Sequence, residues 1–183
     1  MPAYRGISVE QLRCLLEYNP QTGVLRWLPR PVSMFDAEWR ARAWNTRFAG
    51  KEAFTASNSK GYRIGVLLEL PCTAHVVAWA LYYGEWPKEQ VDHWNLDKSD
   101  NRAVNLREAA QSQNVQNRPT PYGSSRHKGV GWHKSSQRWR ARVQKDGKRV
   151  FCGYFHSESA AVAARDACAA SLFGSYAFLN TGA

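Results

Sequence analysis

The feature that most constrains the fold is the strict alternation of arginine with apolar residues in "RWRARVQ", which is followed by "KDGKRVF". Successive side chains of a β-strand point to opposite faces of a sheet, so this alternation predicts a strand with one basic and one apolar face. The Asp146-Gly147 pair is a typical two-residue hairpin turn, and the pattern resumes after it. Residues 138–151 therefore predict an antiparallel hairpin whose two faces differ in chemistry.

The flanking residues extend this hairpin to a small domain over residues 126–183. Ser157 is a good helix N-cap, and Gly174 is well placed to end the helix. Mostly small residues form a stripe that would let this helix sit close on the apolar face: Ala161, Ala164, Cys168 and Leu172. We expect a three-stranded antiparallel sheet packed on one helix, with the basic face open.

Positive charge is concentrated in the same part of the chain. Residues 119–183 hold ten Lys or Arg and three Asp or Glu, a net charge of +7 out of +10 for the whole protein. Such an excess favours a polyanionic partner, most simply nucleic acid, and a solvated basic face is the alternative. An arginine-rich sheet face fits the major groove of double-stranded DNA, where Arg reads guanine and Lys neutralises phosphate.

The remaining composition excludes several other classes of protein. No run of eighteen apolar residues is present, and "MPAYRGISVE" lacks the pattern of a signal peptide, so we expect a cytoplasmic protein without membrane association. None of the four cysteines forms a C-x-x-C pair, so neither a structural zinc nor a disulfide scaffold is expected.

The first part of the chain, residues 1–70, predicts an α/β region that we expect to add DNA contacts. "SVEQLRCLLEY" predicts a short helix capped by Ser8, and "VLRWL" predicts a strand. Residues 31–50 are expected to be irregular. "YRIGVLLEL" predicts one half-buried strand that presents the following residues on one face: Tyr62, Ile64, Val66, Leu68 and Leu70.

The second part, residues 71–118, contains "VDHWNLDKSDNRAVNLREAAQSQN". "TAHVVAWALYYGEWP" predicts a helix ended by Gly84, and "VDHW" predicts a short strand. "NLREAAQSQNVQN" predicts a second helix, with Asn105 as N-cap and Glu108 in capping-box spacing. "RPTPYGSS" has the composition of a linker, which we place at residues 119–125.

The polar residues of this second part fit the chemistry of phosphodiester hydrolysis. A neutral histidine is a natural base near pH 7, and carboxylate and amide oxygens are suited to bind Mg²⁺ or Mn²⁺. Asp92 and His93 are neighbours on a strand and should point to opposite faces, while Asn114 should turn toward the strands from the following helix. His75, at a helix start, favours a structural hydrogen bond over a catalytic role.

These residues and their spacing resemble the HNH endonucleases, within them the phage and intron-encoded homing enzymes of the D-H…N…N form. The resemblance implies a ββα-metal finger that binds one divalent ion, Mg²⁺ or Mn²⁺. It implies that His93 is the general base, that Asp92 and Asn114 are metal ligands, and that Asn105 is a structural member of the catalytic set. It also implies cleavage that leaves 5′-phosphate and 3′-hydroxyl ends.

The last part resembles the APETALA2/ethylene-response-factor type of DNA-binding domain, through "KGVGWHK", "RWRARV", "GYF", an alanine-rich helix and the final "LN". Such domains dock their sheet in the major groove. The contact residues expected here are Lys128, Trp132, Arg138, Arg140, Arg142, Gln144, Arg149 and Phe151.

Together these features predict an α+β, site-specific, homing-type DNA endonuclease in a bacterial or phage-infected cell. We expect it to act on double-stranded DNA as a monomer that nicks one strand, while cutting both strands would need a dimer or re-engagement. A DNA-binding regulator with an inactive nuclease fold is the main alternative. An RNA-binding protein with a structural metal finger is a second one.

Overall fold

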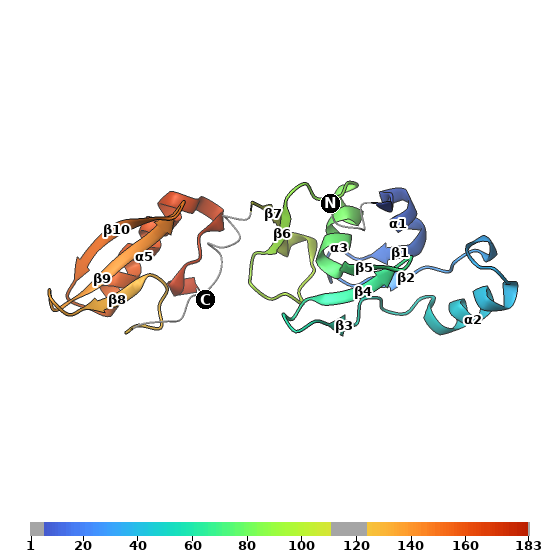
Figure 1. Ribbon diagram of the computed structural model, residues 1–183, viewed down its shortest axis with the longest axis horizontal. Coiled ribbons are helices and arrows are strands. Elements are labelled where there is room, and N and C mark those ends of the chain that lie inside the picture. The colour runs from blue at the N-terminus through green and yellow to red at the C-terminus, as the bar shows by residue number, and fades with distance from the viewer. Residues whose placement is uncertain (1–5, 111–123, 183) are drawn as a thin grey trace. The chain divides into compact units, whose positions relative to one another are not determined.

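The computed structural model describes residues 6–110 and 124–182. The chain forms two compact units, Met1–Glu108 and Ala109–Ala183 (Figure 1). Both units combine helices with small antiparallel sheets, which agrees with the predicted α+β class. No helix in the described ranges is both long and apolar enough to cross a bilayer.

The N-terminal unit begins with helix α1 (Val9–Leu15), which starts at Ser8 as predicted. The Ser8 hydroxyl accepts a hydrogen bond from the Gln11 backbone N–H at 3.2 Å, and the Gln11 side chain accepts one from the Ser8 N–H at 2.8 Å. This reciprocal pair is a capping box, which satisfies two otherwise unpaired donors at the helix start. The chain then continues into strand β1 (Leu16–Tyr18), which pairs with β2 (Leu25–Trp27).

The expectation of irregular structure over residues 31–50 is wrong. A 3-10 turn, η2 (Val32–Met34), leads into helix α2 (Glu38–Phe48). Trp44 of this helix packs edge-on against Trp27 of β2 at 5.8 Å between ring centroids. The Arg30 guanidinium lies 4.0 Å from the Trp44 ring centroid. These contacts join residues far apart in sequence, and a local pattern does not reveal them.

A three-stranded sheet of β3 (Ala56–Ser57), β4 (Arg63–Leu67) and β5 (Leu70–Thr73) follows. The sequence predicts one strand through residues 62–70 with Val66 on the buried face, and this is wrong. A tight turn at Leu68 and Glu69, with φ angles of 46° and 68°, reverses the chain instead. Leu67 is fully buried, whereas Val66 is 58% exposed.

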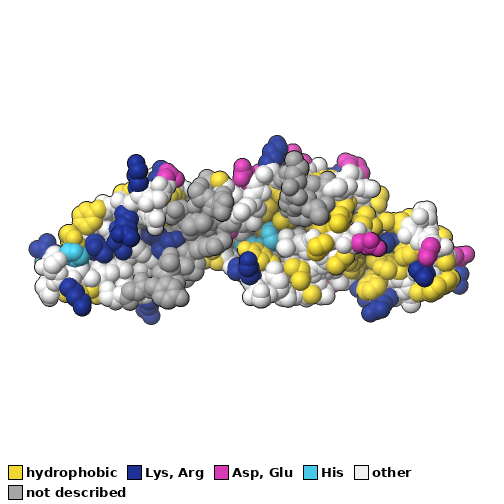
Figure 2. Space-filling model, viewed as in Figure 1, with side chains coloured by type: hydrophobic (Ala, Val, Ile, Leu, Met, Phe, Trp, Pro, Cys, Tyr) yellow, Lys and Arg dark blue, Asp and Glu magenta, His cyan; other side chains and the backbone are white. Residues whose placement is uncertain are grey.

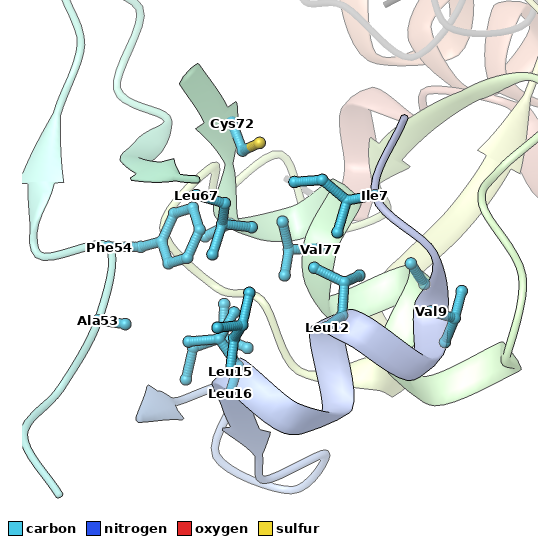
Figure 3. Close-up of a cluster of buried hydrophobic side chains, with 13 residues drawn as sticks. Ile7, Val9, Leu12, Leu15, Leu16, Ala53, Phe54, Leu67, Cys72 and Val77 are labelled. Atoms are coloured by element: carbon cyan, nitrogen blue, oxygen red, sulfur yellow. The ribbon is translucent and has the colours of Figure 1, made fainter. Parts of the chain in front are cut away.

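Helix α3 (Ala74–Tyr83) ends at Gly84, as predicted, with Gly84 in the left-handed conformation at φ 80°. Val77 of α3 packs in one cluster with Leu12 of α1, Leu67 of β4 and Phe54 (Figure 3). Residues on both sides of position 70 therefore share one hydrophobic core, and this core holds the helix that supports the candidate active site.

The C-terminal unit contains strands β8 (Val130–His133), β9 (Arg138–Lys145) and β10 (Lys148–Phe155), in the antiparallel order β10-β9-β8. Helix α5 (Glu158–Phe173) packs on one face of this sheet (Figure 1). The Ser157 hydroxyl caps the helix by accepting from the Ala160 N–H at 3.2 Å. The three strands, the 146–147 turn and the helix are as predicted, but the buried stripe differs: Ala161, Val162, Arg165, Asp166 and Ala169.

The chain end is tied to this helix through two 3-10 turns, η4 (Gly174–Tyr176) and η5 (Asn180–Gly182). The Asp166 carboxylate accepts hydrogen bonds from the Asn180 side chain at 2.9 Å and from the Thr181 N–H at 3.0 Å. Asn180 also accepts from the Lys128 N–H at 2.8 Å, which fixes the entry to β8.

Candidate active site and nucleic-acid interface

Strands β6 (Gln90–His93) and β7 (Leu106–Ala109) form a two-stranded sheet beside α3. Val91 and Leu106 cluster with Val76 of α3, which fixes the inner face of this pair. His93 shares the face of Val91, because side chains two positions apart on a strand point the same way. His93 is 3% exposed, and Asp92 lies on the opposite face, as the sequence predicts.

The predicted helix does not begin at Asn105, since Leu106–Ala109 form β7, and the part of the prediction beyond residue 110 lies outside the described residues. A short 3-10 turn, η3 (Ala103–Asn105), precedes the strand. Glu108 makes no capping box with Asn105; its carboxylate accepts from the backbone N–H groups of Lys88 at 2.5 Å and Glu89 at 3.1 Å. Tertiary packing of Leu106 under α3 overrides the local helical pattern.

Asn105 instead fixes the loop that follows His93. Its side-chain oxygen accepts from the Asn95 N–H at 2.9 Å, and its side-chain nitrogen donates to the Asp100 carbonyl at 2.8 Å. Its carbonyl also accepts from the Trp94 N–H at 2.9 Å. Asn105 is 4% exposed, and its part-buried bonds hold both ends of the loop.

The loop between the two strands is further held by its own polar side chains. The Asn95 and Asp97 side chains each accept from a backbone N–H two residues later, at 2.9 Å in both cases. Asp100 pairs with Arg102 at 2.6 Å, and this hydrogen bond is the main reason that the Asp100 pKa falls to about 2. Such local side-chain bonds replace the backbone pairing that a loop lacks.

The protonation of the His93 ring is set by Asn101, a residue that the sequence analysis did not single out. The ring Nε2 lies 3.2 Å from the Asn101 side-chain oxygen. The Asn101 side-chain nitrogen donates to the Ser99 carbonyl at 3.3 Å, which fixes the orientation of the amide. An amide oxygen only accepts hydrogen bonds, so Nε2 carries the proton and Nδ1 holds the lone pair of a neutral ring.

His75 of α3 and Tyr62 enclose the same imidazole. The His75 and His93 ring centroids are 5.0 Å apart, and Tyr62 lies 5.0 Å from His75 and 5.9 Å from His93. His75 is buried, and its Nδ1 has no hydrogen-bond partner among the described residues. Burial, followed by repulsion from His93, lowers the His75 pKa to about 3.

Burial also lowers the pKa of His93, against the opposing effects of its bond to Asn101 and of nearby carboxylates. The neutral form of this imidazole is therefore favoured near pH 7. Because a general base must be unprotonated to accept a proton, this is the form that base catalysis requires.

Asp92 on the outer face pairs with Arg107 of β7. The two side chains are 3.1 Å apart at their closest atoms and only 11% and 16% exposed. Arg107 was missed in the sequence analysis because the predicted helix placed it far from Asp92. Strand β7 brings it to the same face, since it alternates with the inward-facing Leu106.

The structure describes one of the two predicted metal ligands, Asp92. Asp92 provides a carboxylate of the kind that Mg²⁺ and Mn²⁺ prefer, whereas Asn114 lies outside the described residues. Within residues 6–110 and 124–182, no three His, Cys, Asp or Glu side chains cluster as metal ligands. The donor chemistry of Asp92 thus fits a hard cation, with the amide of Asn114 as the predicted second ligand.

The C-terminal sheet has one covered face and one open face. Val130, Ala141, Ala161 and Val162 form the core beneath the covered face. Cross-strand pairing assigns the open face, because paired residues share a face: Arg140 pairs with Gly131 and Tyr154, and Arg142 with Phe151. The open face therefore includes six predicted contact residues: Arg138, Arg140, Arg142, Gln144, Arg149 and Phe151.

Two predicted DNA-contact residues do not lie on that open face. Trp132 pairs with Trp139 across β8 and β9, on the face that α5 covers, with ring centroids 5.4 Å apart. Lys128 precedes β8, and its ammonium nitrogen lies 5.6 Å from the centroid of the Phe178 ring. Burial, followed by repulsion from Arg165, lowers the Lys128 pKa to about 8.

The open face also carries two residues that the sequence analysis missed, His133 and Tyr154. Strict alternation would place Tyr154 opposite to Phe151, but the register shifts between Phe151 and Gly153. This β-bulge returns Tyr154 to the open face, where its ring lies 4.9 Å from Phe151 and 5.0 Å from His133. The bulge requires glycine at position 153. The backbone there has a φ of 136°, which residues with a side chain rarely adopt, and an added Cβ would lie 2.9 Å from the Phe155 ring.

The arginines of the open face are close together. Burial lowers the pKa of Arg142, and the neighbouring Arg140 and Arg149 lower it further. Among the described residues no ion pair involves an open-face arginine. Lys and Arg side chains dominate the charged groups of this unit in the view of Figure 2. A cluster of cations without carboxylates is typical of a surface that binds a polyanion.

Comparison with known proteins supports the interpretation of the central segment. The model of the HNH endonuclease family matches residues 72–116, which include α3, β6, the loop and β7. This segment is therefore similar to HNH endonucleases, a class of nucleases that generally use a divalent metal. No curated protein and no solved structure matches the chain.

Proposed function

We propose that the protein is a metal-dependent DNA endonuclease of the HNH type, with a C-terminal unit that binds double-stranded DNA. The observation that carries this proposal is that a hydrogen bond to Asn101 fixes the orientation of the buried His93 imidazole. Its Nε2 is held by Asn101 at 3.2 Å, and its backbone neighbour is Asp92, within the segment that is similar to HNH endonucleases.

His93 acts as the general base in this proposal. With Nε2–H donated to Asn101, the lone pair on Nδ1 takes the proton of the attacking water. Asn105 keeps the loop and the backbone after His93 in place through its two side-chain hydrogen bonds. The near-complete burial of the ring limits the group that it activates to a small nucleophile such as water.

Asp92 and Asn114 would hold the divalent ion, Mg²⁺ or Mn²⁺. When bound, such an ion neutralises charge on the phosphate and on the leaving oxygen. Arg107 orients the Asp92 carboxylate at 3.1 Å and adds a positive charge on the face where a phosphate would lie.

The C-terminal unit supplies affinity and site choice through its arginine-rich open face. One finger of this kind cuts one strand per engagement, so the monomer nicks DNA and leaves 5′-phosphate and 3′-hydroxyl ends. Because a separate unit would choose the site of cleavage, we assign this chain to the homing type of endonuclease.

Relaxation of supercoiled plasmid in Mg²⁺ or Mn²⁺ tests the nuclease. Wild-type protein should nick the plasmid, and His93→Ala should slow nicking by about 10²–10⁴-fold, the usual contribution of a general base. His156→Ala, which changes an exposed histidine in the other unit, is the matched control and should nick at the wild-type rate.

One observation favours the alternative, a DNA-binding regulator with an inactive nuclease fold. His93 is only 3% exposed, so a substrate must approach a nearly closed ring. Equal, background-level relaxation by wild-type protein and His93→Ala, with normal binding of duplex DNA, would establish the regulator and reject the nuclease.

A further inference from the structure

The open face of the C-terminal sheet carries a continuous group of rings, His133, Tyr154 and Phe151, which we name the aromatic row. Tyr154 lies between the other two, at 5.0 Å from His133 and 4.9 Å from Phe151. His133 comes from β8 and the other two from β10, so the row crosses above the middle strand β9. Gly131, which pairs with Arg140 in this region, contributes no side chain.

The aromatic row is not part of a core. Phe151 is 57% exposed and Tyr154 is 39% exposed, whereas α5 and its alanines cover the opposite face of the sheet. Both rings are held outward by the backbone, because the bulge between Phe151 and Gly153 sets their common face. A clustered set of exposed rings on a rigid sheet marks a surface for contact with a partner.

Three arginines of the middle strand β9 lie directly beside the row. Arg142 pairs with Phe151, Arg140 with Tyr154, and Arg138 with His133 across the strands. A partner for this face therefore presents negative or hydrogen-bond-accepting groups next to apolar groups. The major groove of duplex DNA does so, with phosphates on both sides and thymine C5-methyl groups on its floor.

Stacking on unpaired bases is a different use of exposed rings, and the geometry disfavours it. A base needs a free ring face that lies parallel to it. The rings of the row are tilted against one another by 43° and 60°, so that they contact each other and form one continuous apolar strip. Such a strip suits a line of methyl groups better than it suits stacked bases.

We infer that the aromatic row of the open face contacts the C5-methyl groups of thymine, and that the protein prefers sites with thymines between guanines read by the flanking arginines. The two ring-to-ring distances limit the row to about 10 Å, which is about three base-pair steps of 3.4 Å. Two or three thymines are therefore the most that it can cover. The inference rests on the proposed DNA-binding role of this unit.

Replacement of thymine by uracil tests the inference, because it removes the methyl group and keeps every hydrogen-bonding group of the base. Duplexes are first selected from a randomised 25-base-pair pool with the full-length His93→Ala protein in EDTA. The selected duplex is then made with thymine or with deoxyuridine, and the affinity for each is measured by fluorescence anisotropy at one salt concentration. The His93→Ala parent, whose open face is intact, should bind about three- to five-fold more weakly for each buried methyl group removed.

Two groups of variants locate the effect. Phe151→Ala and Tyr154→Ala, each added to His93→Ala, should reduce the difference in affinity between the thymine and uracil duplexes, and the two together should reduce it further. Arg142→Ala should bind both more weakly and keep the difference between them. Tyr82→Ala, at a tyrosine that is 51% exposed in the other unit, is the matched aromatic control and should keep both the affinity and the difference. Thermal melting of each variant checks that it is folded.

Equal affinity of the parent protein for the thymine and uracil duplexes would overturn the inference and leave the proposed function intact. Selection of a pool without fixed thymines would do the same, as would tighter binding to the single strand than to the duplex. Failure to bind any duplex would remove both the inference and the proposed DNA-binding role.

Discussion

The candidate active site and the open sheet face differ in whether their charged side chains are paired. In the site, charged and polar groups are bonded to one another: Asp92 to Arg107, Asp100 to Arg102, and His93 to Asn101. On the open face, burial and then the neighbouring Arg140 and Arg149 lower the pKa of Arg142, and none of these three arginines is in an ion pair among the described residues. The first arrangement fixes the position of a reacting group, and the second keeps positive charge available for a partner.

This difference predicts that reaction and binding can be removed separately. Asp92→Ala should reduce plasmid nicking to background, a loss of at least about 10³-fold, because a metal-held charge stabilises the transition state. Affinity for duplex DNA, measured by anisotropy in EDTA, should change less than about two-fold. A parallel loss of binding would show that the two units do not divide the work in this way.

The converse change lies on the open face. Arg140→Ala with Arg142→Ala should weaken binding by about 1–3 kcal/mol for each arginine that reads a base. If these arginines bind phosphate instead, the slope of log K against log salt should fall by about 0.9 for each of them. Anisotropy titrations over a range of salt separate the two cases. Nicking at saturating protein should remain, and its disappearance would contradict the assignment of these arginines to binding alone.

A smaller effect is expected at Asn101, whose role is to position His93. Asn101→Leu removes the acceptor for Nε2–H and should slow nicking by about 10- to 100-fold, the usual cost of losing a residue that orients a functional histidine. Asn101→Asp keeps an acceptor and should recover most of the rate. Nitrogen-15 NMR of the imidazole should report the Nε2–H tautomer in wild type and a mixture in Asn101→Leu. An unchanged tautomer would show that Asn101 acts only in folding.

The smallest effect concerns stability and pH. The His75 pKa is lowered to about 3 in the folded protein from an ordinary value of 6.5. The unfolded chain therefore binds a proton first as pH falls, so stability is full above pH 6.5 and declines toward pH 3. Protonation of His75 should lower the free energy of unfolding by at most about 1.4 kcal/mol for each pH unit in this range.

His75→Leu should reduce that slope, as measured by urea unfolding at several pH values. The matched control, His156→Leu, should keep the wild-type slope because His156 is exposed. An unchanged slope in His75→Leu would mean that other groups, such as His93, cause the acid sensitivity.

Much of the fold was predictable where the signal is local. The cap at Ser8, the end of α3 at Gly84, the turn at 146–147 and the start of α5 at Ser157 all follow from side chains that act on their own backbone. The alternation through β9 likewise assigns Arg138, Arg140 and Arg142 to one face. These features depend on neighbours within a few residues, which a sequence displays directly.

The failures occur where distant residues decide the outcome. The chain after Asn105 has a helical pattern, yet Leu106 pairs its strand with β6 under Val76 of α3. That error concealed Arg107 as the partner of Asp92. The sequence did not predict the role of Asn101, because its bond to His93 spans a loop whose path the sequence does not specify. The position of Trp132 off the open face likewise depends on strand pairing, which places it with Trp139, and its contact with DNA stays a prediction.

The bulge within β10 has a consequence for how such a protein can change its binding surface. One extra residue in the strand decides whether Tyr154 faces solvent or the helix. If the same residues alternated regularly, without the bulge, Tyr154 would turn toward the helix although no aromatic side chain had changed. Related chains that have the same rings but a regular strand at this position should therefore present a different surface to a partner, even where their arginines are the same.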